Sequence, residues 1–253
     1  MELNYKEFGQ GDPIIILHGL FGTSDNWQTI AKKLAKDYLV YIIDQRNHGR
    51  SPHDDEFNYK VMAEDLKRFM ESHWMYSARI IGHSMGGKTA MQFATDYPDM
   101  VEKLVIVDIA NESYEGGHEI IFNALLGLDL DTIESRKQAD AILQTQIKDF
   151  GVRQFLLKNL TRGKDGKYIW KMNLPVIHQN YQVILSKIKE DEIYENATLF
   201  VKGGLSKYIT RANFETTKLF FPNAKIKTID KVGHWVHAEA PKEFLEIIIK
   251  FLK

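Results

Sequence analysis

The chain contains no cysteine in its 253 residues. This absence excludes disulfide bonds, thiolate nucleophiles and zinc sites built on sulfur. A chain without cysteine is also compatible with the reducing cytoplasm, where disulfides are rare. Residues 1–7 lack the apolar core of a secretory signal peptide. We therefore expect a cytoplasmic protein.

Long apolar runs and an excess of charge are also missing. No apolar run is long enough to cross a bilayer, so we predict no membrane span. The formal net charge is -1, which does not suggest a groove for nucleic acid or a patch for a membrane surface. The sequence has no repeat and no low-complexity segment. We predict no nucleic-acid partner.

The residues that are present follow the pattern of a large α/β domain. Hydrophobic residues make up 44% of the chain and charged residues 26%, as in ordinary globular proteins. Short apolar runs alternate with helix-like segments, which is typical of parallel strands covered on both faces. These runs occupy residues 14–17, 39–43, 80–81, 103–108, 197–201 and 224–229, and residues 3–8 resemble an edge strand. We predict a mostly parallel twisted sheet with helices on both faces, which binds ligands at the carboxyl ends of its strands.

The alternation of strands and helices stops in the middle of the chain. Residues 111–191 contain four helix-like segments, at 120–130, 139–150, 154–160 and 174–188, and a turn at 163–166. Strand-like runs then resume. We predict a core domain formed by residues 1–110 and 192–253, and a helical cap formed by residues 111–191 and inserted over the carboxyl ends of the strands.

The sequence from Gly82 to Gly86 is Gly-His-Ser-Met-Gly, and it lies between a short apolar run and a helix-like run. This is the G-x-S-x-G nucleophile elbow in its expected context of strand, sharp turn and helix. Both glycine positions need a residue without a Cβ, because side chains there would collide with the neighbouring helix and strand. The pattern makes Ser84 the candidate nucleophile.

An elbow serine needs a base to accept its proton and an acid to orient that base. His234 follows the last predicted strand in a glycine-containing loop, and we prefer it to His237, three residues later. Ser206 occupies the usual place of the acid, after the penultimate strand, and carries no charge. Asp108 ends the strand one earlier, so the predicted order is Ser84, Asp108, His234. We place Asp44 with Arg46 in a structural turn.

Two backbone N–H groups should form the oxyanion hole. Met85 follows the nucleophile and begins a helix, so its N–H is available. The second donor should come from the loop after His18, with Leu20 preferred to Phe21. His18 and a second histidine, His48, are interpreted as buried residues that bind backbone groups. The predicted residues that contact substrate are Phe21, His83, Trp170 and Trp235.

Four segments together resemble the α/β-hydrolase fold superfamily over nearly the whole chain. They are Leu17-His18-Gly19, the turn from Asp44 to Ser51, the elbow from Gly82 to Gly87, and Gly233-His234. More narrowly, the sequence is similar to the small YbfF-like bacterial esterases, on the evidence of residues 18–22 with Asn26-Trp27, residues 46–49, and residues 159–160, 168–170 and 173–174 of the cap. The resemblance implies a cytoplasmic carboxylesterase or thioesterase with its acid on the strand before the cap.

The predicted reaction is two-step acyl transfer through an acyl-enzyme on Ser84, with a small-molecule ester or thioester as substrate. It requires no metal and no organic cofactor. A carbon–carbon bond hydrolase or lyase would use the same nucleophile and base, but it resembles the pattern with the later acid. A non-hydrolytic ligand receptor on this fold is a further alternative. The natural substrate and the oligomeric state do not follow from the sequence.

Overall fold

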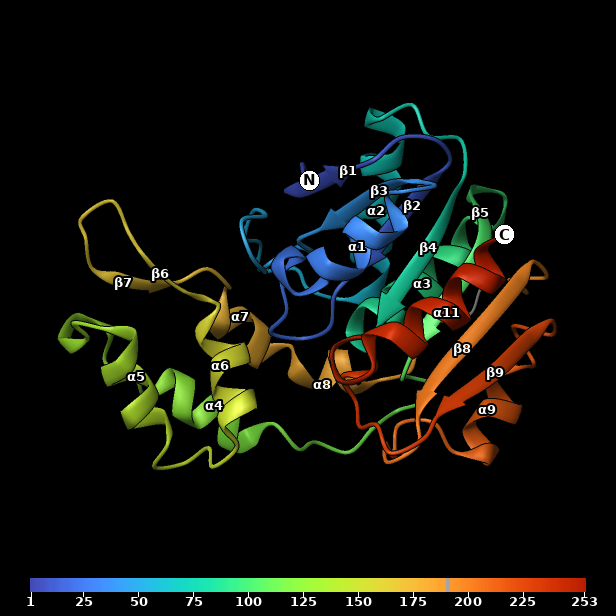
Figure 1. Cartoon of the computed structure of the whole chain (residues 1–253). Coiled ribbons are helices and arrows are strands. Elements are labelled where there is room, and N and C mark those ends of the chain that lie inside the picture. The colour runs from blue at the N-terminus through green and yellow to red at the C-terminus, as the bar shows by residue number, and fades with distance from the viewer. Residues whose placement is uncertain (190–191) are drawn as a thin grey trace.

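A seven-stranded sheet runs through the centre of the protein in the computed structural model, which describes residues 1–189 and 192–253 (Figure 1). The strand order is β1-β3-β2-β4-β5-β8-β9. Only β1 is antiparallel to its neighbour, and the other pairs are parallel. The strands are β1 (Tyr5–Phe8), β2 (Pro13–Leu17), β3 (Leu39–Ile43), β4 (Ala78–His83), β5 (Val101–Val107), β8 (Ala197–Gly203) and β9 (Ala224–Ile229).

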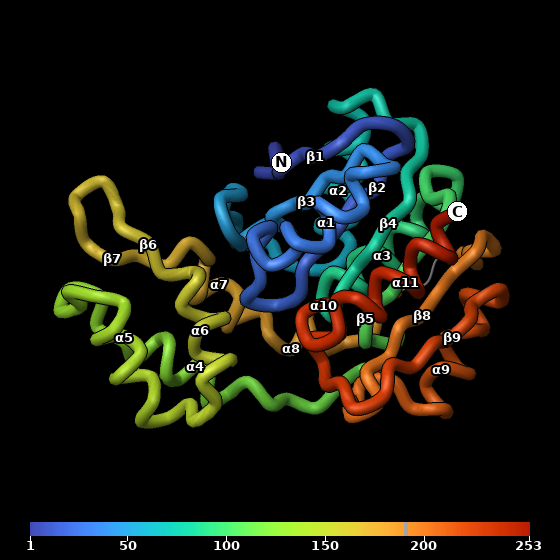
Figure 2. Tube along the Cα trace, in the orientation of Figure 1, coloured from blue at the N-terminus to red at the C-terminus, as the bar shows by residue number. Residues whose placement is uncertain are grey.

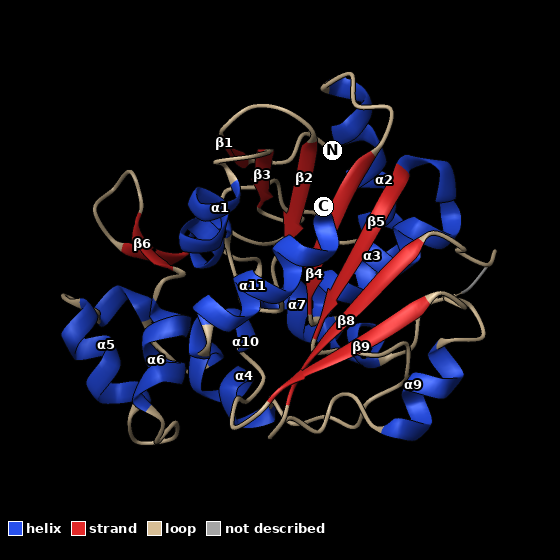
Figure 3. Ribbon diagram, turned by 45° about the vertical axis from the view of Figure 1, so that its right-hand side comes forward, coloured by secondary structure: helices blue, strands red, loops and turns tan. Residues whose placement is uncertain are grey.

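Both faces of the sheet are buried, because alternate residues of one strand enter different apolar clusters. In β2, Ile14 and Ile16 pack with Trp27 and with α1 (Gln28–Leu34) and α11 (Pro241–Leu252). Ile15 and Leu17 enter the opposite cluster, with α2 (Tyr59–Ser72) and α3 (Met85–Asp96). Figure 3 shows the twisted strands fanning out between these two helical layers. The predicted fold class is therefore confirmed.

The chain between β5 and β8 leaves the sheet and forms a separate group of helices beyond one end of the strands (Figures 1 and 2). We call residues 111–189 the inserted segment. Its apolar residues belong to the same cluster as the α2–α3 side of the sheet, so the two parts share a core. Its elements are α4 (Glu119–Leu126), α5 (Arg136–Leu143), α6 (Phe150–Leu157), β6 (Leu160–Arg162), β7 (Tyr168–Trp170), α7 (Leu174–Gln179) and α8 (Tyr181–Leu185).

The inserted segment differs from the sequence prediction in two respects. Helix α4 ends earlier than predicted, and α5 and α6 each begin and end earlier than predicted. The helix predicted for residues 174–188 is divided at Asn180 into α7 and α8. A two-stranded hairpin, β6–β7, flanks the turn at residues 163–166 and was not expected. The predicted end of the cap, at residue 191, lies outside the described residues.

Shorter elements complete the core. The loop after β2 contains a 3-10 helix, η1 (Ser24–Trp27), and the chain between β8 and the C-terminus contains α9 (Arg211–Thr217) and α10 (Val236–Glu239). The 3-10 helix η2 (Pro98–Met100) also belongs to the core, whereas η3 (Leu130–Thr132) belongs to the inserted segment. Helix α9 was not predicted. No helix in the described parts of the chain is long and apolar enough to cross a membrane.

Candidate active site

Ser84 lies at the sharp turn between β4 and α3. Its backbone has φ 51° and ψ -119°, a conformation that is strained for a residue with a Cβ. A Cβ on Gly82 would lie 2.3 Å from the Gly86 carbonyl oxygen, and a Cβ on Gly86 would lie 2.5 Å from the Leu17 carbonyl oxygen. The collisions expected from the sequence are therefore present, and only glycines allow strand and helix to approach this closely.

Asp108 lies beside Ser84 at the end of the neighbouring strand. The Ser84 N–H donates to the Val107 carbonyl at 3.0 Å, and the Asp108 N–H donates to the Val201 carbonyl at 2.9 Å. The Asp108 side chain is fully buried, and its Oδ1 accepts a hydrogen bond from the Gly203 N–H at 3.0 Å. The carboxyl ends of β4, β5 and β8 therefore fix the position of this carboxylate.

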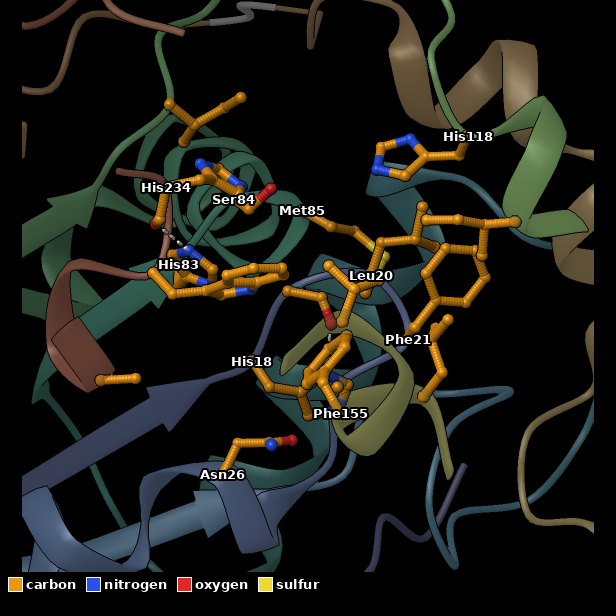
Figure 4. Close-up of a pocket in the computed structure, with 18 of the residues that line it drawn as sticks. His18, Leu20, Phe21, Asn26, His83, Ser84, Met85, His118, Phe155 and His234 are labelled. Atoms are coloured by element: carbon orange, nitrogen blue, oxygen red, sulfur yellow. Dashed lines mark hydrogen bonds between the residues drawn. The ribbon is translucent and has the colours of Figure 1, made fainter. Parts of the chain in front are cut away.

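His234 joins the carboxylate from the loop after β9. Its Nδ1 donates to Asp108 Oδ2 at 2.7 Å, which leaves Nε2 directed away from the carboxylate. The Tyr208 ring stacks on the imidazole with centroids 4.2 Å apart, and the His83 Nε2 donates to the His234 carbonyl at 3.0 Å (Figure 4). Both contacts hold the ring and its loop in one orientation. The predicted residues Ser84, Asp108 and His234 are thus brought together.

His237, the alternative base, and Ser206, at the usual place of the acid, have other contacts. His237 is buried, stacks on Trp27 with centroids 3.9 Å apart, and has a pKa lowered to about 3 by burial first and then by His234. The Ser206 Oγ accepts a hydrogen bond from the Tyr208 N–H at 3.2 Å. Neither residue is the partner of the His234 Nδ1, which binds Asp108.

Two buried histidines support the loop that carries Leu20. His18 Nδ1 donates to the Gly19 carbonyl at 2.8 Å, and its Nε2 accepts from the Gln45 N–H at 3.0 Å. His48 Nε2 accepts from the Phe21 N–H at 3.3 Å. Burial lowers the pKa of His18 and lowers that of His48 to about 3, so both rings are neutral and each can accept one N–H.

These contacts distinguish the two candidate oxyanion donors of the loop. The Phe21 N–H is occupied by His48, whereas the Leu20 N–H has no hydrogen-bond partner among residues 1–189 and 192–253. Met85 is the first residue of α3, so its N–H has no intrahelical acceptor. Both N–H groups belong to residues that line the same cavity as Ser84.

The predicted turn around Asp44 is present, with one change of partner. The Asp44 carboxylate accepts hydrogen bonds from the Ser24 N–H at 2.6 Å, the Arg50 N–H at 3.0 Å and Asn4 Nδ2 at 2.8 Å. Arg46, which the sequence pairs with Asp44, instead bonds Asp65 through Nε at 2.6 Å. Asp65 lies on α2, some twenty positions later, and sequence spacing gave no indication of this contact.

A cavity of about 540 Å³ opens above Ser84, between the sheet and the inserted segment (Figure 4). Of the residues predicted to contact substrate, Phe21, His83 and Trp235 line it. Trp170 does not line it, and its contact with substrate stays a prediction. Trp170 lies on β7, where it pairs with Leu160 in the hairpin and packs against the core cluster, so its position in the sequence pattern reflects packing.

Several residues that the sequence analysis did not single out also line the cavity. They include Lys88, one helical turn after Ser84, His118 of the inserted segment, and Tyr208, whose ring stacks on His234. His118 Nδ1 lies 2.6 Å from the Tyr181 hydroxyl. Of these three residues, only Lys88 could have been found from the sequence, because it lies one helical turn after Ser84. In the described residues no group of three or more His, Asp or Glu side chains is placed to hold a metal ion.

Comparison with known proteins agrees with this architecture. The family model described as "alpha/beta hydrolase fold" matches residues 12–241. The sequence is 37% identical to the esterase YbfF of Escherichia coli over 241 residues, covering 95% of this chain and 92% of that protein. It is 36% identical to the mouse sn-1-specific diacylglycerol lipase ABHD11 over 247 residues, covering 94% of this chain and 80% of that protein.

A solved structure agrees closely as well. The structure titled "Marine microorganism esterase" superimposes with a TM-score of 0.97 at 45% sequence identity and covers 99% of both chains. The family model spans far more than half of the chain, and both relatives exceed 30% identity over most of their length. The protein therefore belongs to the α/β-hydrolase fold family.

Proposed function

We propose that this protein is a serine carboxylesterase that uses Ser84 as nucleophile, His234 as base and Asp108 as the acid that orients the base. The enzyme is an esterase/lipase-type α/β hydrolase, as its relatives are named. One observation carries the assignment of these three catalytic residues. The His234 Nδ1 lies 2.7 Å from the buried Asp108 carboxylate, and His234 lines the same cavity as Ser84.

The geometry supports the following first step. With Nδ1 bound to Asp108, the neutral ring presents Nε2 as the atom that accepts the Ser84 proton. The serine oxygen attacks the ester carbonyl carbon, and the carbonyl electrons move onto the oxygen. The buried carboxylate stabilises the imidazolium that forms. When the intermediate collapses, Nε2 returns the proton to the departing alcohol, and the acyl group remains on Ser84.

The second step repeats the chemistry with water. His234 accepts a proton from a water molecule, the hydroxide oxygen attacks the acyl-enzyme, and the proton returns to Ser84 as the carboxylic acid leaves. In both steps negative charge develops on the carbonyl oxygen. We assign its stabilisation to the N–H groups of Leu20 and Met85. Removing one donor from an oxyanion hole typically costs on the order of 3 kcal/mol of transition-state stabilisation.

We further propose that residues 1–110 and 192–253 are the catalytic domain and that residues 111–191 are a cap over it. Phe155 and Tyr181 of the inserted segment line the cavity together with Phe21 and Trp235 of the core. A substrate bound there would touch both parts. A mostly apolar lining suits the acyl chain of a small-molecule ester, and the same residues would also accept an acyl thioester. The cysteine-free composition favours a cytoplasmic location.

The reaction class is tested with matched substrates. We would measure kcat/KM for p-nitrophenyl esters from acetyl to long acyl chains, and for thioesters with the same acyl groups. The proposal predicts turnover of esters with an optimum chain length, because the enclosed cavity limits the acyl group. Turnover of thioesters alone would change the substrate class, and no turnover of either series would contradict hydrolysis of carboxylic esters.

A further inference from the structure

Lys88 is a buried lysine one turn after the nucleophile, on helix α3. Only 1% of its surface is exposed. Its Nζ donates three hydrogen bonds, to the carbonyl oxygens of Glu112 at 2.7 Å, Leu185 at 3.1 Å and Ser186 at 2.6 Å. An ammonium group has three N–H donors, so all of them are used. A buried, fully bonded cation in an apolar cluster needs an explanation, because charge burial opposes folding.

The three carbonyl groups belong to the two ends of the inserted segment. Glu112 lies where the chain leaves the core after β5. Leu185 is the last residue of α8 and Ser186 follows it, where the chain returns to the core. The two connections run side by side. The Tyr114 N–H donates to the Leu185 carbonyl at 3.0 Å, and the Lys187 N–H donates to Ser113 Oγ at 3.1 Å. Lys88 therefore binds both connections at the point where they meet.

Other groups around Lys88 strengthen the same contact. The ammonium lies 4.7 Å from the Tyr114 ring centroid and 5.7 Å from that of Tyr59, both within the range of cation–π attraction. One turn further along α3, Gln92 Nε2 donates to the Lys189 carbonyl at 2.7 Å, and its Oε1 accepts the Lys189 N–H at 3.2 Å. Burial lowers the pKa of Lys88 to about 7, and the negative charge of Glu112 offsets only part of this effect.

The bound connections form one wall of the cavity. Lys88, Tyr59, Tyr114, Ile184 and Leu185 all line it. The Tyr59 hydroxyl donates to the Ile184 carbonyl at 2.6 Å, which attaches this wall to α2 as well. A shift of either connection would move side chains that surround the substrate. The hydrogen bonds of the Asp108 carboxylate, to the Gly203 N–H and to His234, involve no residue of the inserted segment.

We propose that Lys88 is a positioning residue that fastens both connections of the inserted segment to the nucleophile helix and thereby fixes the wall of the substrate pocket. This inference rests on the proposed function only in taking Ser84 as the nucleophile. It differs from a general contribution to stability, because it predicts a local change at the two connections and a change in substrate binding.

The first test measures hydrogen exchange in Lys88→Met, which replaces the unbranched side chain by one that is a single atom shorter and removes the ammonium. The proposal predicts at least about tenfold faster exchange of the amides of residues 112–114 and 186–189, because the carbonyl groups that hold the two connections lose their shared donor. This readout needs no substrate, so it stands even if the protein hydrolyses no ester.

Lys103→Met is the matched control. Lys103 also donates to two consecutive carbonyl groups, those of Phe251 at 3.0 Å and Leu252 at 3.2 Å, and it lies 5.8 Å from the Phe251 ring centroid. It joins β5 to the end of α11, away from the inserted segment. Its loss should speed exchange near the C-terminus and leave the two connections and the KM unchanged.

The second test separates KM from kcat. Lys88→Met should raise the KM for the best ester by about tenfold or more and change kcat by less than about threefold, because the Lys88 ammonium bonds the pocket wall and not the side chains of Ser84, Asp108 or His234. Lys88→Arg, which keeps the charge and the N–H donors, should restore part of the exchange protection. If Lys88→Met fails to fold, the same exchange and kinetic measurements are made on Lys88→Gln, which removes the charge but retains two N–H donors. Exchange at the connections within twofold of the wild type, or a loss confined to kcat, would overturn the proposal.

Discussion

Ser84 and Asp108 both adopt left-handed backbone conformations, with φ of 51° and 52°, at the ends of adjacent strands. Such conformations are unfavourable for residues with a Cβ and are found where the surrounding structure imposes them. The N–H of each residue still donates to a carbonyl of the next strand, so the positive φ occurs directly where each strand ends. This geometry brings an alcohol and a carboxylate to the same edge of the sheet, where the His234 loop meets them.

Replacing Asp108 by Asn tests its proposed role. The amide has nearly the same shape as the carboxylate, but it can present an N–H to Nδ1 and favour the wrong imidazole tautomer. By analogy with the aspartate-to-asparagine change in the classical serine-protease triad, we expect kcat to fall about 10⁴-fold. The measurement is kcat for the best ester, with the folded state checked by thermal unfolding.

Ser206→Ala is the control for this variant. Ser206 occupies the usual place of the acid, but its Oγ binds the Tyr208 N–H and not His234. We expect kcat to change by only a few-fold. Equal losses in Asp108→Asn and Ser206→Ala would contradict the assignment of the acid.

At the scale of the element, the elbow depends on the approach of α3 to β2 and β4. Gly86→Ala would place a Cβ 2.5 Å from the carbonyl oxygens of both Leu17 and His18. Backbone atoms cannot move aside as a flexible side chain can, so we expect a loss of at least about 3 kcal/mol in the free energy of unfolding. The measurement is chemical denaturation monitored by circular dichroism.

Gly117→Ala provides a matched comparison in the same chain. No heavy atom lies within 4 Å of a Cβ built on Gly117, and its backbone does not have a positive φ. We expect a change within about 0.5 kcal/mol. A small effect of Gly86→Ala, similar to that of Gly117→Ala, would show that the elbow tolerates a side chain.

Elements with strong local signals could be predicted from the sequence. The apolar runs of the parallel strands and the elbow glycines depend on residues close together in the chain, and Ser84, Asp108 and His234 each lie at or soon after the end of such a run. The hairpin β6–β7 was missed because its strands have only three residues each, too few to show alternation. Helix α9 was missed although Thr210 and Asn213 form a capping box, a short signal that was not weighed.

The remaining misses concern contacts between distant segments. Arg46 bonds Asp65, and Lys88 bonds residues about 24 and 97 positions away, so no local pattern reveals either partner. Trp170 matched the sequence pattern of the family but packs in the hairpin. Sequence motifs therefore indicated the proposed catalytic residues, whereas the walls of the pocket depend on how the inserted segment returns to the sheet.

At the scale of the whole molecule, the buried histidines make the fold sensitive to acid. His48 and His237 are fully buried, and burial lowers the pKa of each to about 3. In the unfolded chain a histidine binds a proton near its ordinary pKa of about 6.5. Between these values the unfolded state binds more protons than the folded state. Stability is therefore present above pH 6.5 and is lost as the pH falls towards 3.

The size of this effect can be measured by denaturant unfolding at several pH values. We expect each of these two histidines to remove about 2 kcal/mol of stability between pH 7 and pH 5. His237→Phe, which can keep the stacking on Trp27, should reduce the loss by that amount. His178→Gln changes an exposed histidine and should not reduce it. An equal pH dependence in wild type and His237→Phe would contradict the linkage.

The most direct measurement of the central claim is ester hydrolysis by the wild type and Ser84→Ala, purified in parallel. The substrate is the p-nitrophenyl ester with the highest kcat/KM in the acyl series. Ser84 is the proposed covalent nucleophile, so we predict that its loss lowers kcat by about 10⁶-fold, while thermal unfolding stays within a few degrees of the wild type. Turnover by folded Ser84→Ala at a rate close to that of the wild type would contradict the account.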